Sequence, residues 1–168
     1  MTDDLGRAPP IAHDAAAKEE LLGRCAIFRR CEPQDLAALA GSSRWMEHAD
    51  GVDLVREGDA PHHLLIVERG EAVVLKRGAN GIEHPINRLG PGDSVGEMAL
   101  FDRQPRSGTV RAEGPVRSLS LDLSDFVQLA ETRPTLVPVL VEIGALLAAR
   151  LPVSSPPPPA TAGPTPAQ

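Results

Sequence analysis

The chain has 168 residues, of which 23 are acidic and 17 basic, so its formal net charge is -6. This length suits one compact domain with tails. The negative charge argues against a general basic surface for nucleic acid or anionic membrane. Aromatic side chains make up only 2% of the residues, which leaves few stacking platforms for single-stranded nucleic acid.

Both ends of the chain are polar and contain prolines, so we expect residues 1–15 and 152–168 to be disordered tails. Residues 16–151 then form the domain. The first ten residues, MTDDLGRAPP, are acidic where a signal peptide would be basic and then apolar. A cytoplasmic location is therefore expected.

The first part of the domain has helical spacing of its apolar residues. Residues 15–30 are predicted to form one helix, and Pro33 suits the first position of a second helix that runs to Ala40. Cys25 and Cys31 lie six residues apart, a spacing unlike a metal knuckle or a redox pair. We expect them to be free, partly buried thiols.

From residue 43 to residue 122 the chain is punctuated by glycines, and the runs between them are β-rich. HLLIVE, EAVVLKR and VRSLSLDL are three such runs, the last with alternating leucines. Asn80 and Gly81 predict a hairpin with a type I′ turn. About eight short strands without helical periods between them indicate a β-sandwich, jelly roll or small barrel.

Helical spacing returns after the last strand. Ser124 or Asp125 can cap a short helix to about residue 131, and a longer helix is expected from Thr135 to Leu151. The longer helix is apolar on most sides, which favours cover by a partner helix or a homodimer. Its apolar run is shorter than the roughly 20 residues that cross a bilayer, so no membrane span is expected.

The loop GEMALFDRQPRSGTV, residues 96–110, combines one glycine, one carboxylate and one arginine with little bulk. Gly96 allows a close backbone approach, and free N–H groups of a helical turn after it would bind an anion. Arg106 can add a planar guanidinium to the same anion, while Glu97 suits a sugar hydroxyl. Alternatively, Glu97 and Arg106 pair with each other across an exposed loop, a contact worth about 0–1 kcal/mol.

The segment that contains these residues resembles a motif of a known protein family. PGDSVGEMALFDRQPRSGTV resembles the phosphate-binding cassette of cyclic nucleotide-binding domains, which occur in catabolite activator protein, cyclic-nucleotide-dependent kinases and gated channels. GVDLVREGDAPHHLLIVERGEAVVL is similar to the family's first strands, and CAIFRRCEPQDLAALA to its N-terminal helical piece. The resemblance covers about residues 20–151. It implies an α+β, mainly β fold: an eight-stranded antiparallel jelly roll flanked by N-terminal helices and a C-terminal helical pair.

The resemblance also implies a binding site between the sixth and seventh strands. Gly96 and the backbone of Met98 and Ala99 would meet the cyclic phosphate, and Glu97 would accept a hydrogen bond from the ribose 2′-hydroxyl. Arg106 would neutralise the phosphate.

Two further positions belong to this implied site. Ser107 would add a hydroxyl and Gly108 a backbone N–H, although Gly108 stands where the family usually has alanine. Catabolite activator protein also has serine at the position of Ser107, which favours cAMP over cGMP as the ligand.

The residues that would cover the base are less clearly marked. Ser154 and Ser155 fall where catabolite activator protein has its adenine-contacting Thr-Ser pair, but prolines interrupt the helix that should carry them. Leu147, Arg150 and Leu151 are the alternatives for this lid.

Other functions have weaker support. The histidines His48, His62, His63 and His84 show no metal-binding spacing and are interpreted as surface residues, so no metal or cofactor is expected. No Ser/His/Asp grouping or nucleophile elbow marks an enzyme. The 17 proline-rich residues after Leu151 are too few for a helix-turn-helix, so direct DNA binding is not expected. The sequence also shows no channel or kinase segment.

The sequence thus predicts a free-standing cyclic nucleotide sensor. Ligand would re-dock the helix from Thr135 to Leu151 and so signal to an unknown protein effector or change the oligomeric state. The alternative is a scaffold of the same fold that no longer binds nucleotide and serves protein interaction. The presence of both Glu97 and Arg106 argues against this alternative.

Overall fold

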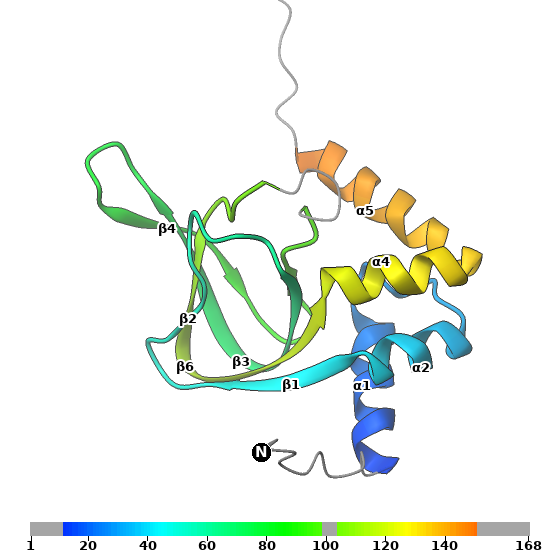
Figure 1. Ribbon diagram of the computed structural model, residues 1–168. Helices are drawn as coiled ribbons and strands as arrows, with labels where there is room; N and C mark the ends of the chain where they lie inside the picture. Colours follow the sequence, from blue (N-terminus) through cyan, green and yellow to red (C-terminus); the bar gives the residue numbers. More distant parts are fainter. Residues whose placement is uncertain (1–11, 99–103, 151–168) are drawn as a thin grey trace, which may run out of the picture.

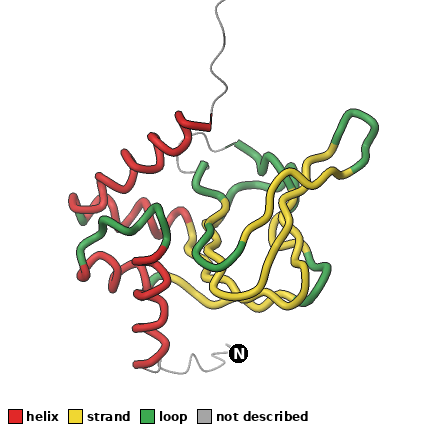
Figure 2. The backbone as a smooth tube through the Cα atoms, turned by 180° about the vertical axis from the view of Figure 1, so that it is seen from behind, coloured by secondary structure: helices red, strands yellow, loops and turns green. Residues whose placement is uncertain are grey.

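The computed structural model describes residues 12–98 and 104–150. In these ranges four helices and six strands are present. Figures 1 and 2 show the helices gathered on one side of the strands, with the hairpin between β3 and β4 projecting on the far side. The helices are α1 (Ala12–Arg24), α2 (Pro33–Gly41), α4 (Leu123–Thr132) and α5 (Val137–Arg150), with a short 3-10 helix η1 (Pro134–Leu136) before α5.

All strand pairings of the sheet are antiparallel, as the sequence predicts. The order is β1-β6-β3-β4, with β2 also paired to β6 and β5 to β3. The strands are β1 (Ser43–His48), β2 (Asp53–Val55), β3 (His63–Arg77), β4 (Glu83–Leu89), β5 (Ser94–Val95) and β6 (Thr109–Asp122).

The expected number of eight strands is wrong for the described residues, because two strands continue through a glycine. Gly70 in β3 and Gly114 in β6 both have positive φ, at 87° and 82°. The pairing of β3 with β6 shifts register on both sides of Arg69, which bends the strands without ending them. A side chain on Gly70 would also collide with the backbone of Pro115. The runs HLLIVE and EAVVLKR are therefore one strand.

The hairpin at Asn80 and Gly81 is present, but its turn differs from the predicted one. The Gly81 N–H donates to the Gly78 carbonyl at 2.9 Å, which makes Ala79 and Asn80 the central pair of the turn. Gly81 follows with φ 78°. This arrangement is typical of a three-residue loop, not of a two-residue type I′ loop.

The N-terminal helical region differs at both ends from the expected range. The helix α1 begins at Ala12, earlier than residue 15, and Trp45 Nε1 anchors its first turn by donating to the Asp14 carboxylate. It ends at Arg24, not at residue 30, and three-residue turns follow, with the Phe28 N–H donating to the Cys25 carbonyl at 3.0 Å. Both cysteines are free, as predicted.

The C-terminal helices lie close to the expected ranges. The N-cap of α4 is Asp122, so the predicted cap at Ser124 or Asp125 is wrong, because Leu123 is already helical. Pro138 lies in the first turn of α5, where the missing N–H costs no helical hydrogen bond. No helix in the described ranges is long and apolar enough to cross a membrane.

The strand β3 divides the core into two clusters by alternation. Its Leu64 and Ile66 pack with the helices, in a cluster that contains Phe28 and Phe126 with ring centroids 6.2 Å apart. Its Leu65 and Val67 point to the other side, into a cluster formed by the strands. A strand buried on both faces explains the continuous apolar run HLLIVE. The loop that follows β5 lies next to this second cluster.

Candidate functional site

A pocket of about 360 Å³ lies between the loop that joins β5 to β6 and the inner face of the sheet. Its volume is in the range of small-molecule sites, about 300–1,000 Å³. Six predicted ligand-binding residues line it, while Ala99 lies outside the described residues. The six are Gly96, Glu97, Met98, Arg106, Ser107 and Gly108.

Gly96 allows the arginine of the same loop to lie against the backbone. Its φ is 103°, a conformation that side chains rarely adopt. A Cβ at this position would collide with Nη1 of Arg106 and would lie 2.8 Å from the His63 carbonyl oxygen. Glycine is therefore required here both by conformation and by space.

Arg106 is buried, with 8% of its surface exposed, and is held from β3 and from the loop before it. Its Nη2 donates to the His63 carbonyl, and its backbone N–H donates to the Asp59 carbonyl at 2.9 Å. Its own carbonyl accepts from the Gly58 N–H, also at 2.9 Å. The first contact holds the guanidinium, and the two main-chain contacts hold the backbone that carries it.

Glu97 is also buried, with 4% of its surface exposed. The alternative of an exposed surface pair between Glu97 and Arg106 is therefore wrong. Burial lowers the pKa of the Arg106 guanidinium, and the carboxylates of Glu97 and Asp59 oppose this shift. An arginine nevertheless stays charged in proteins, so the pocket holds a fixed cation and a carboxylate side by side. Such a pair suits a ligand with an anion next to a hydrogen-bond donor.

The second half of the loop is held against β3. Lys76 donates to the Ser107 carbonyl and lies 3.8 Å from the Glu57 carboxylate. A Cβ on Gly108 would lie 2.8 Å from the carbonyl oxygen of Leu75. The close approach of β3 therefore explains why glycine, not the family's usual alanine, stands at this position.

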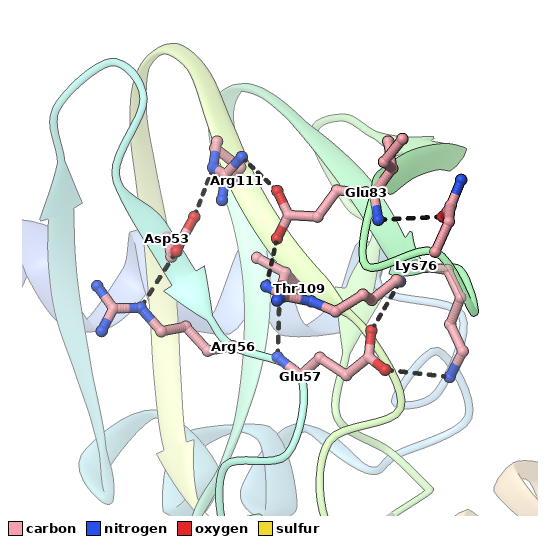
Figure 3. Close-up of polar contacts among 10 residues, drawn as sticks. Asp53, Arg56, Glu57, Lys76, Glu83, Thr109 and Arg111 are labelled. Carbon is pink, nitrogen blue, oxygen red and sulfur yellow. Dashed lines mark hydrogen bonds and ion pairs between the residues drawn. The ribbon is translucent and has the colours of Figure 1, made fainter.

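Behind this part of the site, charged side chains connect β2, β4 and β6 (Figure 3). Arg111 Nε donates to Asp53 at 2.6 Å, and Arg111 Nη1 donates to Glu83 at 2.9 Å. The hydrogen bond from Arg111 lowers the pKa of Asp53. Nearby, the Glu57 N–H donates to the Thr109 hydroxyl at 3.0 Å. The partners are 20 or more residues apart in the chain, so no local motif marks this network.

The part of the pocket wall that the strands form is largely apolar and was not predicted from the sequence. It is formed by side chains of four strands, among them Val55, Val74, Ile86, Leu89 and Val110. Alternation in EAVVLKR places Val74 on one face of the strand, but the pairing that brings β4 beside it is set by the hairpin. Chain pattern alone does not show which face borders a pocket.

The predicted lid falls mostly outside the structure. Leu147 and Arg150 lie near the end of α5, and Leu151, Ser154 and Ser155 lie outside the described residues. For metal binding, the described part of the chain has no group of three or more His, Cys, Asp and Glu side chains placed to hold an ion.

Comparison with known families gives one match that spans the site. The family model described as "Cyclic nucleotide-binding domain" matches residues 46–133, more than half of the chain. The match begins in β1 and ends just after α4. It therefore includes every described residue of the loop between β5 and β6.

Individual proteins are similar over much of the chain. A cAMP-dependent protein kinase regulatory subunit of Blastocladiella emersonii is 32% identical over 111 residues, which are 66% of this chain and 28% of that protein. A CRP-like cAMP-activated global transcriptional regulator of Mycobacterium tuberculosis is 29% identical over 125 residues, 74% of this chain and 56% of that protein. The chain thus spans less than two thirds of either relative.

Among solved structures, the regulatory domain of Toxoplasma gondii PKA crystallised with cAMP has a similar fold. The TM-score is 0.73 at 23% sequence identity, over 82% of this chain and 51% of that one.

Proposed function

Because the chain belongs to the cyclic nucleotide-binding domain family, we propose that the pocket between β5 and β6 binds a cyclic nucleotide, with cAMP favoured over cGMP. The protein would then act as a sensor, not as an enzyme. One observation carries the proposal: Gly96, Glu97 and Arg106 line one pocket, with both charged side chains buried beside each other.

Each of these groups matches one part of a cyclic ribose phosphate. The Arg106 guanidinium would bind the phosphate, with Gly96 and the backbone of Met98 and Ala99 against the same oxygens. Glu97 would accept from the ribose 2′-hydroxyl. A pocket for phosphate alone would not favour a buried carboxylate, because like charges repel.

The remaining loop residues support the choice of ligand. The Ser107 hydroxyl and the Gly108 N–H would contact the phosphate from its other side. Serine at position 107 is shared with catabolite activator protein, and two relatives have names that refer to cAMP. These points favour cAMP over cGMP.

For the output, we propose that ligand shifts the docking of α5. The Cys25 thiol lies beside Ser94 of the pocket, and the turn after Cys25 carries Arg29, which donates to Glu142 of α5 at 2.9 Å. The short segment that carries Cys25 and Arg29 therefore connects the pocket wall with α5, and a movement of the wall can be transmitted through it. On α5, Val137 and Val141 are exposed, at 49% and 69%, and would be covered by an effector or a second copy of the chain.

The alternative is a scaffold of the same fold that no longer binds nucleotide. A thermal-shift titration with cAMP and with cGMP separates the two functions. Ligand at about 100 times its Kd stabilises the fold by about 2.7 kcal/mol, so a clear rise in the unfolding midpoint is expected with cAMP. No rise with either nucleotide would favour the scaffold.

The proposed movement of α5 has its own test. Hydrogen exchange of residues 137–150 should change when cAMP is added, because the ligand shifts the equilibrium between two docked states. Equal exchange with and without nucleotide, in a protein that binds cAMP, would contradict this output and leave the binding proposal intact.

A further inference from the structure

Strand β4 contains a bulge where it borders the pocket. Its Pro85 pairs with Leu75 of β3, and its Asn87 pairs with Val74. One step along β3 thus corresponds to two steps along β4, and Ile86 is the extra residue. A bulge of this kind changes the direction of side chains locally, and such bulges are frequent beside active sites.

The bulge explains why two consecutive residues of one strand line the same pocket. In a regular strand, neighbouring side chains point to opposite faces. Here both Ile86 and Asn87 line the pocket, together with Val74 and Leu89. Ile86 is 62% exposed, which leaves an apolar surface at the pocket opening that a flat ring could cover.

Asn87 stands out in this wall because its neighbours there, Val74, Ile86 and Leu89, are apolar. Within the described part of the chain, its carboxamide has no hydrogen-bond partner. It also lies on β4, whereas the charged pair, Glu97 and Arg106, lies in the loop between β5 and β6. If these two residues bind the ribose phosphate, the base is the remaining part of the ligand, and it would pack against this apolar wall.

We propose that the β4 bulge recognises the base: Ile86 packs on its face, and the Asn87 carboxamide reads its edge and selects adenine over guanine. This inference rests on the proposed function. A carboxamide has one acceptor and two donors. On its N6/N7 edge, adenine offers one donor and one acceptor, so the amide can make two hydrogen bonds there.

Guanine differs on the same edge. Its O6 and N7 are both acceptors, so the carboxamide oxygen of Asn87 finds no donor and faces a carbonyl oxygen. The selection therefore comes from the pairing pattern and does not depend on Ser107, which lies at the phosphate side of the pocket.

Isothermal titration of the full chain with cAMP, cGMP and 7-deaza-cAMP, which lacks the N7 acceptor, tests the inference. The wild type should bind cAMP more tightly than the other two. In Asn87→Ala the cAMP/cGMP affinity ratio should fall at least about fivefold, and the preference for cAMP over 7-deaza-cAMP should disappear. Asn87 is exposed, so the unfolding temperature without ligand should stay near that of the wild type.

A matched control is His84→Ala, an exposed position of the same strand that does not line the pocket. Its affinity ratios should equal those of the wild type. If wild type binds cAMP but Asn87→Ala keeps both ratios within twofold, the inference is wrong and the proposed function stands. If wild type binds none of the three nucleotides, the proposed function itself fails, and the inference with it.

Discussion

The guanidinium of Arg106 occupies the space in which a side chain at Gly96 would lie. A Cβ on Gly96 would be 3.2 Å from Cζ of Arg106 and closer still to its Nη1. The glycine and the arginine are ten positions apart in the chain, and this contact places them side by side. The two residues therefore form one structural unit: replacing the glycine displaces the arginine.

The first prediction concerns Gly96→Ala. It should destabilise the fold by about 2–4 kcal/mol, from positive φ and from the collision with Arg106 and the His63 carbonyl. It should also weaken cAMP binding at least tenfold. Urea unfolding and calorimetry measure the two effects.

Gly92→Ala is the control for Gly96→Ala, because Gly92 also has positive φ, 92°, but open space around it. It should cost about 1–2 kcal/mol of stability and leave affinity unchanged. Equal losses of affinity in both variants would show that the contact with Arg106 does not matter.

The second prediction concerns Arg106→Ala. A buried, charge-assisted hydrogen bond contributes about 1.5–3 kcal/mol, so affinity for cAMP should fall at least tenfold. Arg88→Ala removes an exposed arginine that pairs with Glu113 instead, and its affinity should match the wild type. Unchanged cAMP affinity of Arg106→Ala in calorimetry would exclude the proposed site.

The third prediction concerns Gly108→Ala. The resemblance alone suggests that alanine is acceptable here, because the family usually has it. In this chain the added Cβ would lie 2.8 Å from the Leu75 carbonyl oxygen, which belongs to the backbone of β3 and cannot rotate away. We expect a loss of about 1–3 kcal/mol in urea unfolding. A variant as stable as the wild type would show that the backbone of β3 can shift to accommodate the added Cβ.

The sequence predicted the charged half of the site because its residues lie within one short segment. Gly96, Glu97 and Arg106 are close in the chain, so their spacing is visible without a fold. The groups that hold Arg106, at His63 and Asp59, contact it through backbone oxygens, for which any residue type would serve. Such contacts therefore cannot be recognised from the residue types in the sequence.

The apolar wall of the site and the number of strands could not be predicted from the sequence, because both depend on the register between paired strands. The bulge at Ile86 follows from the register of the hairpin that joins β3 to β4, and the continuation of β3 through Gly70 follows from its pairing with the distant strand β6. Local propensity encodes neither register. The alternating leucines of residues 116–123 did predict the end of β6, since alternation is a local signal. The end of α1 at Arg24 was missed because Cys25 and Phe28 also fit a helical stripe, although three-residue turns bury them.

The fourth prediction concerns the ion pair between α2 and the residue that follows α4. Asp35 is fully buried, with Oδ1 3.2 Å from Arg133 and with Oδ2 lacking a hydrogen-bond partner among the residues that the structure describes. Arg133→Ala would leave this carboxylate without its cation. Because Arg133 is partly exposed, we expect a loss of about 1–3 kcal/mol, below the full cost of breaking a buried pair.

Urea unfolding measures this loss, and Arg24→Ala is the control. Arg24 is exposed and lies 3.7 Å from Glu20, so its removal should change stability by less than about 0.5 kcal/mol. The two variants differ mainly in the burial of the carboxylate left behind. Equal effects would show that Asp35 gains no more from its cation than a surface residue does.

The last prediction concerns pH and His63. Burial lowers the pKa of His63 below its ordinary value of 6.5, and the positive charge of Arg106 lowers it further. Asp122 opposes the shift, while Arg44 and His62 add to it. The folded state therefore binds a proton less readily than the unfolded state does.

The His63 contribution to stability should then be complete at pH values above the unfolded pKa of about 6.5 and should fall as the pH drops below it toward 5, because the unfolded state takes up the proton first. His48 adds in the same direction, since burial lowers its pKa as well. The carboxylates Asp53 and Asp122 have lowered pKa values through their arginine partners, so their contribution is lost only below about pH 4. Urea unfolding at pH 7, 6 and 5 should show a smaller decline for His63→Gln than for the wild type. Parallel curves for the two proteins would mean that His63 titrates alike in the folded and unfolded states.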